Sequence, residues 1–449
     1  MFINGISVSL DKRSDLFWLN NSNINPENII LYFDYHQPIG KHYQKKEDIL
    51  RAIQKHNVKA IHLWEWNYNS KVDSFEKLYE ELKNLSINKR EEKELRKISL
   101  TLIKRIKFWY LFFKRLNIKI HLESFEQGTE NIVKQIALRK LDCCSVGKLR
   151  SHIGAKKRYD LIGFYPNDIF FVPNKDAGKR ITSHSFFKIR HLLISGFAYN
   201  LFTENNKKEL DKIKNIFKEN NKKFVILLID GSHSTNKTFS ENQLITTDSL
   251  SNFYHTLFDE LSKVDDVGII IKTKKLDSFK KLNGVYDRAK GLEKKGICYL
   301  VRDPHGRGPN LYATIADIVI GTGTFYPSAL IDSVSKKKLG LYFDIANLQS
   351  VEKEWYQWGN QKVIFSDIKE LIKKVLNHKN NKMKDKYFGD WSGQKDILDP
   401  YQDNLGSERI GKYLSILLNG FKNKLSSFES ISIANSEFSK SWGQDKILK

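Results

Sequence analysis

Short apolar runs alternate with helical patterns along most of this 449-residue chain. Apolar runs that are bounded by turn residues and separated by segments of helical periodicity are typical of parallel strands joined by crossover helices. We therefore predict an α/β fold. The predicted strands lie at residues 29–33, 58–66, 118–122, 168–172, 224–229, 267–271, 297–301, 318–320, 339–343 and 363–365. The predicted helices lie at residues 47–56, 71–116, 129–141, 250–261, 328–334, 406–420 and 429–440.

The chain is too long for one comfortable core, so two domains are expected. Residues 174–220 combine clusters of Ser, His and Asn with a Lys-rich helical pattern, and we place the domain junction there. The prediction is one α/β domain over residues 1–200 and a second over residues 201–405. Helices over residues 406–449 are expected to pack across the junction.

Composition limits the partners. A formal charge of +23 leaves nucleic acid, anionic membrane and anionic small substrates open as partners, although the lysines are scattered and favour a solvated surface. The cysteines Cys143, Cys144 and Cys298 form neither an even disulfide set nor a zinc pattern. Residues 1–15 lack a signal-like apolar core, and no apolar run is long enough to span a bilayer. We expect a cytoplasmic protein, at most peripheral on the inner face of the membrane.

The stretch 316–344 is a strand, a loop, a helix and a second strand. Its loop carries Thr322, Gly323 and Thr324, and the helix begins near Ser328. In such a unit the free N–H groups of the loop and of the helix start point at one place, with hydroxyls beside it. A phosphate or sugar phosphate is the expected ligand. The alternative is an ordinary strand-helix corner without a ligand.

A second loop follows the predicted strand 224–229. Asp230 supplies a carboxylate, Gly231 allows close approach of the backbone, and Ser232, His233 and Ser234 add hydroxyls and an imidazole. The loop is suited either to cradle a diphosphate or to hold a catalytic carboxylate. A strand-helix turn with an Asx or Ser cap is the competing interpretation.

Basic side chains follow two further strands. Lys272 and Lys274 alternate along an extended segment, so both are expected on one face, where they would neutralise a phosphate. His305 lies in a loop after the strand 297–301 and could contact a base, a ribose or a phosphate. A solvated strand end and a surface histidine are the alternatives.

In the first half, Glu65 and Glu123 end predicted strands among apolar neighbours. Either could deprotonate an acceptor hydroxyl if partial burial raised its pKa. Arg150 could bind an acidic substrate, or it could form a structural salt bridge at the end of a helix. Because charged and small polar residues follow successive strands, we expect two sheets whose carboxyl edges meet at a cleft.

Several motifs are absent. The chain has no Gly-x-Gly-x-x-Gly after its first strand, no P-loop, no Gly-x-Ser-x-Gly and no His-Glu-x-x-His. It also lacks Asp-x-Asp, the usual carboxylate clamp for a metal-bound sugar nucleotide. Dehydrogenase, kinase and classical hydrolase functions are therefore disfavoured.

Other motifs stand in the second half: IDGS at 229–232, IKTK at 271–274, ADIVIG at 316–321, SAL at 328–330, GDWS at 389–392, LDPYQD at 398–403, ERIG at 408–411, AN at 434–435 and WG at 442–443. With these, residues 224–445 resemble glycosyltransferases of the B type. More narrowly, this half is similar to bacterial capsule and surface-polysaccharide biosynthesis proteins, including transferases of Kdo and related ulosonic acids. The first half resembles this family only loosely.

The resemblance implies two facing Rossmann-like domains with a C-terminal helical segment. It also implies transfer without a metal or other cofactor. The donor would be a CMP-, UDP- or GDP-linked sugar, such as Kdo on CMP, and the acceptor a growing surface polysaccharide or glycolipid of capsule or lipopolysaccharide type. The residues carried over to the donor site are Gly231, Ser232, His233, Ser234, Lys272, Lys274, His305, Thr322, Gly323, Thr324 and Ser328.

For the chemistry we expect Glu123 to be the acceptor base, with Glu65 and Arg150 on the acceptor side. Asp230 is the candidate nucleophile if the route is retaining. Two alternative functions remain. One is an epimerase-like enzyme that processes sugar nucleotides on the same scaffold, and the other is a basic protein that binds nucleic acid or anionic lipid. Polar residues at strand ends favour an enzyme, so no nucleic-acid partner is expected, while peripheral contact with an anionic membrane stays open.

Overall fold

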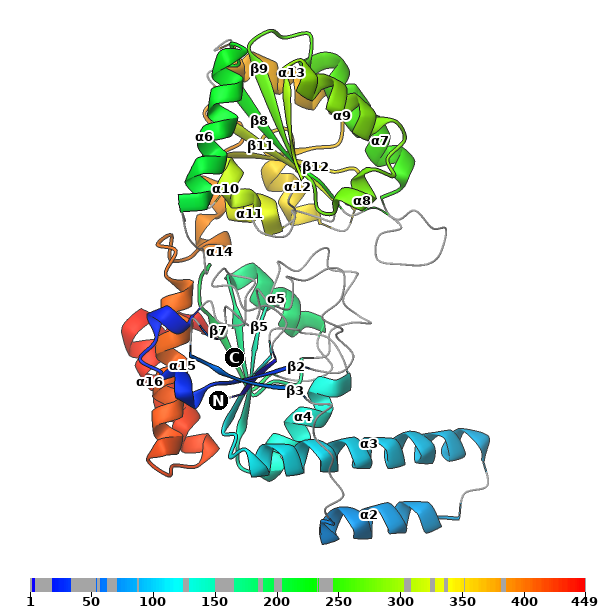
Figure 1. Cartoon of the computed structure of the whole chain (residues 1–449), viewed down its shortest axis with the longest axis vertical. Helices are drawn as coiled ribbons and strands as arrows, with labels where there is room; N and C mark the ends of the chain where they lie inside the picture. The colour runs from blue at the N-terminus through cyan, green and yellow to red at the C-terminus, as the bar shows by residue number, and fades with distance from the viewer. Residues whose placement is uncertain are drawn as a thin grey trace. The chain divides into compact units, whose positions relative to one another are not determined.

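The structure is a computed structural model of the whole chain. It describes residues 2–4, 18–33, 54, 57–62, 71–86, 89–123, 129–149, 165–184, 189–197, 204–231, 233, 245–302, 308–323, 328–334, 338–350, 352–380 and 385–448. The described residues fall into two compact units (Figure 1). The first unit combines the described parts of Met1–Arg150, Ile162–Asn200 and Asp403–Lys449, and the second those of Leu201–Gln402.

The first unit is built on a sheet with the order β14-β7-β6-β5-β4-β1-β2-β3 among the described residues. Neighbouring strands are parallel, except that β14 runs antiparallel to β7. Because β1 pairs with both β2 and β4, the strand order reverses there. The strands are β1 (Phe2–Asn4), β2 (Ile30–Phe33), β3 (Lys59–His62), β4 (Ile120–Glu123), β5 (Cys144–Lys148), β6 (Ile169–Val172), β7 (His191–Ile194) and β14 (Ile447–Leu448).

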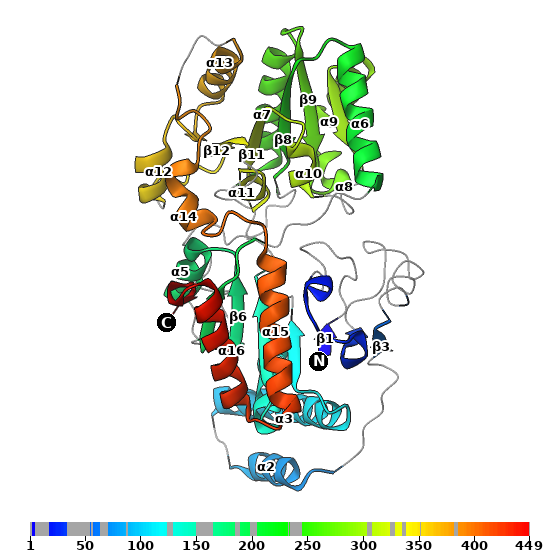
Figure 2. The same cartoon turned by 90° about the vertical axis from the view of Figure 1, so that its left-hand side faces the viewer.

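Helices cover both faces of the first sheet. On one face, Tyr413, Leu414 and Leu417 of α15 pack against Val146 and Phe171 of the strands. Figure 2 shows α15 and α16 side by side in this layer. On the other face, α3 and α4 form a second apolar cluster with β2 and β3. The helices of this unit are α2 (Asp73–Asn84), α3 (Arg90–Arg115), α4 (Thr129–Lys140), α5 (Lys175–His184), α15 (Gly406–Lys422) and α16 (Ser427–Trp442).

The predicted segment 406–449 thus belongs to the first unit as α15, α16 and β14. The start of α16 is fixed by a capping box, in which the Ser426 side chain accepts from the Glu429 N–H and the Glu429 side chain accepts from the Ser426 N–H. Packing of these helices across the domain junction stays a prediction.

The second unit is built on a parallel sheet with the order β10-β9-β8-β11-β12-β13 among its described strands. The order reverses between β8 and β11, as in a doubly wound Rossmann sheet. The strands are β8 (Phe224–Ile229), β9 (Val267–Lys272), β10 (Cys298–Val301), β11 (Ile318–Thr322), β12 (Leu339–Phe343) and β13 (Ile364–Phe365).

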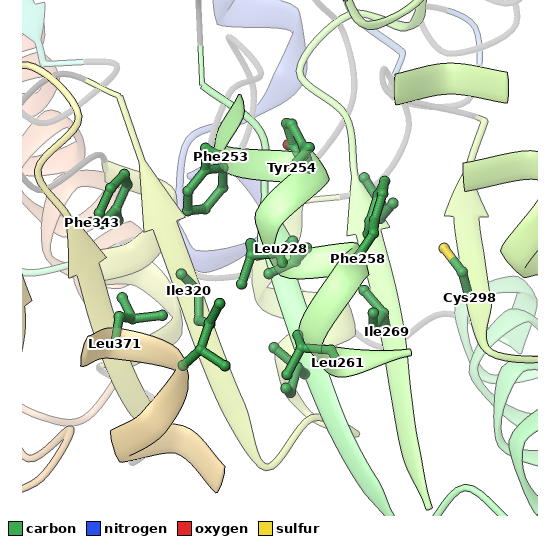
Figure 3. Packing of buried hydrophobic residues seen from close by; sticks show 14 of the residues in the cluster. Leu228, Phe253, Tyr254, Phe258, Leu261, Ile269, Cys298, Ile320, Phe343 and Leu371 are labelled. Carbon is green, nitrogen blue, oxygen red and sulfur yellow. The ribbon is translucent and has the colours of Figure 1, made fainter. Parts of the chain in front are cut away.

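One face of the second sheet packs against α7. Leu228, Ile269 and Ile320 point from the strands toward Phe253 and Phe258 of that helix (Figure 3). Residues of opposite parity are buried too, as expected for a parallel sheet covered on both faces. The helices are α6 (Glu204–Glu219), α7 (Thr247–Leu261), α8 (Leu276–Phe279), α9 (Val285–Lys294), α10 (Pro309–Ala313), α11 (Ser328–Val334), α12 (Lys353–Gly359), α13 (Ile368–Lys379) and α14 (Lys395–Leu398).

The α/β prediction is confirmed, and the apolar run 224–229 is a strand with those same bounds. Four strands of the first sheet were not predicted: the short terminal strands β1 and β14, and the interior strands β5 and β7. β5 has the sequence CSVGK, in which a serine, a glycine and a lysine interrupt the apolar pattern although all five residues are buried. β7 lies inside the segment 174–220 that was assigned to the junction. No helix in the described part of the chain has the length and apolarity that a bilayer span needs.

Candidate functional site

The strand order of the second sheet reverses between β8 and β11, and two glycines meet at that point. Gly231 follows β8 and Gly323 follows β11. A Cβ atom added to Gly231 would lie 3.0 Å from the Thr322 carbonyl oxygen and 3.2 Å from the Gly323 Cα. Gly323 has φ +135°, which residues with a side chain rarely adopt. We call residues 230–231 and 322–323 the switch point, because open α/β sheets bind ligands at the carboxyl ends of strands where the order reverses.

Backbone groups at the switch point are arranged to approach a ligand. Among the described residues, the buried Gly231 N–H donates to no acceptor. An unpaired N–H group in this position is costly unless a ligand accepts from it. The Thr322 hydroxyl donates to the Phe343 carbonyl at 3.2 Å, so that side chain also orders β11 against β12.

The Asp230 carboxylate is buried at the end of β8. Its Oδ1 accepts from the Tyr254 hydroxyl at 3.1 Å, and its Oδ2 accepts from the Lys274 N–H at 3.2 Å. Burial raises the pKa of Asp230 to about 7, against the opposing effects of these two hydrogen bonds and of the lysines Lys272 and Lys274. The carboxylate therefore ties the loop after β9 to the end of β8.

The two predicted lysines differ in environment. Lys272 is the last residue of β9 and is buried, and its Nζ donates to the Thr273 carbonyl at 3.1 Å. Lys274 is exposed, two residues further along. Both ammonium groups are close enough to Asp230 to lower its pKa. The carboxyl ends of β9, β8 and β11 thus place cations and glycine backbone at one edge of the sheet.

His233 has two buried ring nitrogens, and neither makes a hydrogen bond to the part of the chain that the structure describes. Burial and the neighbouring Lys281 lower its pKa, so the imidazole is neutral near pH 7. A neutral imidazole can donate from one nitrogen and accept at the other. Buried polar atoms without a partner are uncommon in native proteins, and a ligand or a water molecule can supply the missing hydrogen bonds.

Several predicted site residues are not placed. Ser328 begins α11, but its side chain lies outside the described part of the structure. The others that lie outside the described residues are Ser232, Ser234, His305, Thr324, Glu65 and Arg150.

In the first unit, Glu123 ends β4, next to the strand where that sheet also reverses its order. Its Oε2 lies 3.1 Å from the Nζ of Lys134, and each side chain is 3% exposed. The Lys134 ammonium also lies over the rings of Tyr32 and Trp109, at 5.3 and 5.0 Å from the ring centroids. The predicted base is therefore the carboxylate of a buried ion pair enclosed by aromatic rings.

A histidine completes this cluster. His121 Nε2 lies 2.9 Å from the Tyr32 hydroxyl and 3.8 Å from the Glu123 Oε2. Burial, followed by the charge of Lys134, holds the pKa of His121 well below its usual range. The ring is thus neutral, and its approach to Glu123 is not an ion pair.

Sequence reasoning missed the partners of both carboxylates. Lys134 lies three residues before Ala137 and four before Leu138, on the buried face of α4, and a lysine at an apolar position was the available signal. The sequence does not mark Tyr254 as the partner of Asp230, because a tyrosine among the apolar residues of α7 is expected to belong to the hydrophobic core.

Two cavities in the second unit lie away from the switch point. One of about 210 Å³ is lined by Val334, Leu339 and Trp391 among others, and one of about 290 Å³ is lined by Lys218, Val225 and neighbours. Leu339 begins β12 and Val225 is near the start of β8, so both cavities are at amino ends of strands. Because ligands of open parallel sheets bind at carboxyl ends, we place the candidate site at the switch point. Among the described residues, no group of three or more His, Cys, Asp or Glu side chains could hold a metal ion.

No protein-family model matches the chain, and no curated protein sequence does. Solved structures do match. The S. aureus MnaA–UDP co-structure is 11% identical, with 93% of this chain and 96% of that chain covered and a TM-score of 0.50. UDP-GlcNAc 2-epimerase from Neisseria meningitidis bound to UDP-GlcNAc is 12% identical, with 91% and 96% covered and a TM-score of 0.50.

A glycosyltransferase from Rickettsia africae is 12% identical, with 98% of this chain and 97% of that chain covered and a TM-score of 0.44. The chain thus shares a fold of Rossmann-like α/β units with the MnaA and UDP-GlcNAc 2-epimerase structures. At such low identity the likeness extends to the fold alone.

Proposed function

We propose that the chain is a glycosyltransferase that binds a nucleotide-sugar donor at the switch point of its second unit. The observation that carries the proposal is the close approach of Gly231 and Gly323 at the carboxyl edge, where the Gly231 N–H has no acceptor among the described residues. A glycine that leaves room for a ligand and offers an N–H group is suited to phosphate oxygens. Lys272 and Lys274 add positive charge to the same edge.

These groups give the donor site its chemistry. In sugar transfer the nucleotide leaves as negative charge develops on its phosphate, and fixed N–H dipoles and cations lower the energy of that charge. The proposal assigns this work to the Gly231 N–H and the two lysines, without a metal. His233 is assigned to the donor because its buried ring nitrogens have no hydrogen-bond partner among the described residues. The places of Ser232, Ser234, His305, Thr324 and Ser328 at the donor stay predictions.

Asp230 is a weaker candidate for the nucleophile than for a positioning role. Both of its oxygens already accept hydrogen bonds, from Tyr254 and from the backbone of Lys274. A nucleophilic carboxylate needs an oxygen that is open to the sugar. We therefore assign Asp230 to holding the β9 loop beside the phosphate.

The acceptor side is proposed in the first unit. Glu123 lies at the point where that sheet reverses its order, which is the default ligand position of an open α/β sheet. As the acceptor base it would take a proton from a sugar hydroxyl, with Lys134 holding its carboxylate in one orientation. Glu65 and Arg150 remain proposed acceptor contacts.

The donor and acceptor are proposed from resemblance. Motifs between residues 224 and 445 are similar to those of capsule and Kdo transferases, so a CMP-linked ulosonic acid is the first donor to test. UDP- and GDP-sugars are the next, and a saccharide or glycolipid is the proposed acceptor. Contact with an anionic membrane through the basic surface belongs to the same proposal.

A second candidate is an epimerase-like enzyme that uses the sugar nucleotide alone. It is favoured by one observation: the structures that match with a TM-score of 0.50 include a UDP-GlcNAc 2-epimerase bound to UDP-GlcNAc. The two candidates share the donor site and differ in whether an acceptor is needed.

The test has two steps. Thermal shift with CMP, CDP, UDP and GDP finds the nucleotide, because a ligand that binds only the native state raises Tm by mass action. The matching nucleotide-sugars are then incubated with and without saccharide acceptors. Turnover that requires an acceptor supports the transferase, and a changed sugar nucleotide without acceptor supports the epimerase. If none of these nucleotides shifts Tm, both candidates are wrong.

A further inference from the structure

A buried tyrosine holds one side of the switch point. Tyr342 lies in β12 with no exposed surface, and its hydroxyl is 3.2 Å from the Gly323 carbonyl oxygen. The same hydroxyl is 3.5 Å from the Asp344 Oδ1. A hydroxyl has one proton to donate, and the shorter and better hydrogen bond is the one to Gly323.

The tyrosine is itself held in place. Asp344, just beyond β12, is buried, and its Oδ2 accepts from the Leu348 N–H at 2.7 Å and from the Tyr356 hydroxyl of α12. The Asp344 N–H donates to the Phe365 carbonyl at 2.7 Å. Groups from β12, β13 and α12 thus converge on the strand end that carries the Tyr342 hydroxyl.

Gly323 needs such a restraint. With φ +135° and no side chain, its backbone has conformational freedom that folding must remove. Its Cα is the atom that faces Gly231 across the switch point, with 3.2 Å between it and the Cβ position of Gly231. Rotation about the ψ bond of Gly323 leaves this Cα in place and turns the Gly323 carbonyl beside Gly231, so a hydrogen bond to that carbonyl fixes how the peptide group is presented at the switch point.

We propose that Tyr342 is a positioning residue of the donor site: its hydrogen bond to the Gly323 carbonyl sets the switch point in the conformation that receives the donor's diphosphate. The inference rests on the proposed nucleotide-sugar function. Restraint before binding raises affinity because the entropy of ordering the loop is lost on folding and not on binding.

The test replaces Tyr342 by phenylalanine, which removes the hydroxyl and keeps the ring in the core. One net hydrogen bond is worth roughly 0.5–1.5 kcal/mol, so we expect the Kd for the nucleotide to rise about two- to twelvefold. The Kd is measured by calorimetry at 20 °C or more below the Tm of each variant, where the protein is folded. Probes are the nucleotide identified by thermal shift and inorganic pyrophosphate.

Tyr299→Phe is the matched control. Tyr299 lies in β10 of the same unit, and its hydroxyl donates to Glu209 at 2.9 Å, away from the switch point. The two variants lose the same chemical group, a phenolic hydroxyl that donates a hydrogen bond. We expect both to lower Tm to a similar extent and only Tyr342→Phe to weaken binding.

The outcomes separate the inference from the function on which it rests. If the wild-type protein binds none of the nucleotides or pyrophosphate, the proposed function and the inference are both overturned. If the wild-type protein binds and Tyr342→Phe binds with the same Kd, only the inference is overturned. Equal weakening by Tyr342→Phe and Tyr299→Phe also overturns it, since the effect would then follow from lost stability.

Discussion

Replacing Asp230 by asparagine should change how the stability of the second unit depends on pH. The folded protein holds this buried carboxyl with a pKa of about 7, against an ordinary value of 3.8. The folded state therefore binds a proton more tightly than the unfolded state does. The contribution of Asp230 to stability is therefore highest below about pH 4, falls as the pH rises from about 4 to about 7, and is level above that.

The magnitude follows from the two pKa values. Their difference, 7 minus 3.8, corresponds to about 4 kcal/mol, since a change of one in pKa is about 1.4 kcal/mol. This is an upper limit, because water can reach a charged carboxylate by local rearrangement. Asparagine cannot ionise, so the variant lacks this pH dependence, although it also loses one of the two hydrogen bonds that the carboxylate accepts.

The assay is urea denaturation of the wild-type protein and of Asp230→Asn at several pH values between about 4 and 8. We expect the unfolding free energy of the variant, relative to the wild-type protein, to rise with pH by up to about 4 kcal/mol. Asp287→Asn is the control, because that side chain is 81% exposed on α9 of the same unit. A difference between Asp230→Asn and wild type that stays constant over this range would refute the burial argument.

Three further predictions concern the two candidate sites. Gly231→Ala should weaken nucleotide binding at least tenfold by calorimetry, because its Cβ would lie 3.0 Å from the Thr322 carbonyl oxygen and the backbone there must shift. Lys134→Met should lower the unfolding free energy by about 3–5 kcal/mol in urea denaturation, since it leaves Glu123 buried without its cation. The double variant with Glu123→Gln should recover part of this loss. If it recovers none, the ion-pair explanation is wrong. Addition of EDTA should leave the nucleotide-induced Tm shift unchanged, and a lost shift would show that donor binding needs a metal.

The second unit was more predictable from sequence than the first, for a physical reason. Its strands are buried on both faces, so residues such as those of β8 form an unbroken apolar run that ends abruptly at Asp230. The boundary between apolar and polar residues then marks the carboxyl edge directly. The same boundary between apolar and polar residues lies at the end of β12, where LGLYF is followed by Asp344, a residue that was not predicted to belong to the site.

In the first unit the buried positions include polar residues. β5 contains Ser145 and Lys148, which are buried, and Ser145 donates to the Asp168 carboxylate at 2.9 Å. β4 carries His121 and Glu123 toward α3 and α4, on the face opposite Ile120 and Leu122. Periodicity cannot reveal such positions, because their burial depends on partners that are distant in sequence.

A polar residue at the end of a strand is therefore not by itself evidence of a functional role. Asp230 and Asp344 each follow the last residue of a strand, and both are buried with both carboxylate oxygens engaged within the second unit. A carboxylate whose oxygens are already occupied orders the loop it holds, and the ligand meets the backbone that the loop presents. At the switch point that backbone is Gly231 and Gly323. In chains of this fold, the informative sequence signal is therefore the glycine that follows the acidic residue. Two substitutions separate the roles of these neighbours. Gly231→Ala should weaken nucleotide binding, and Asp230→Asn should change the pH dependence of stability.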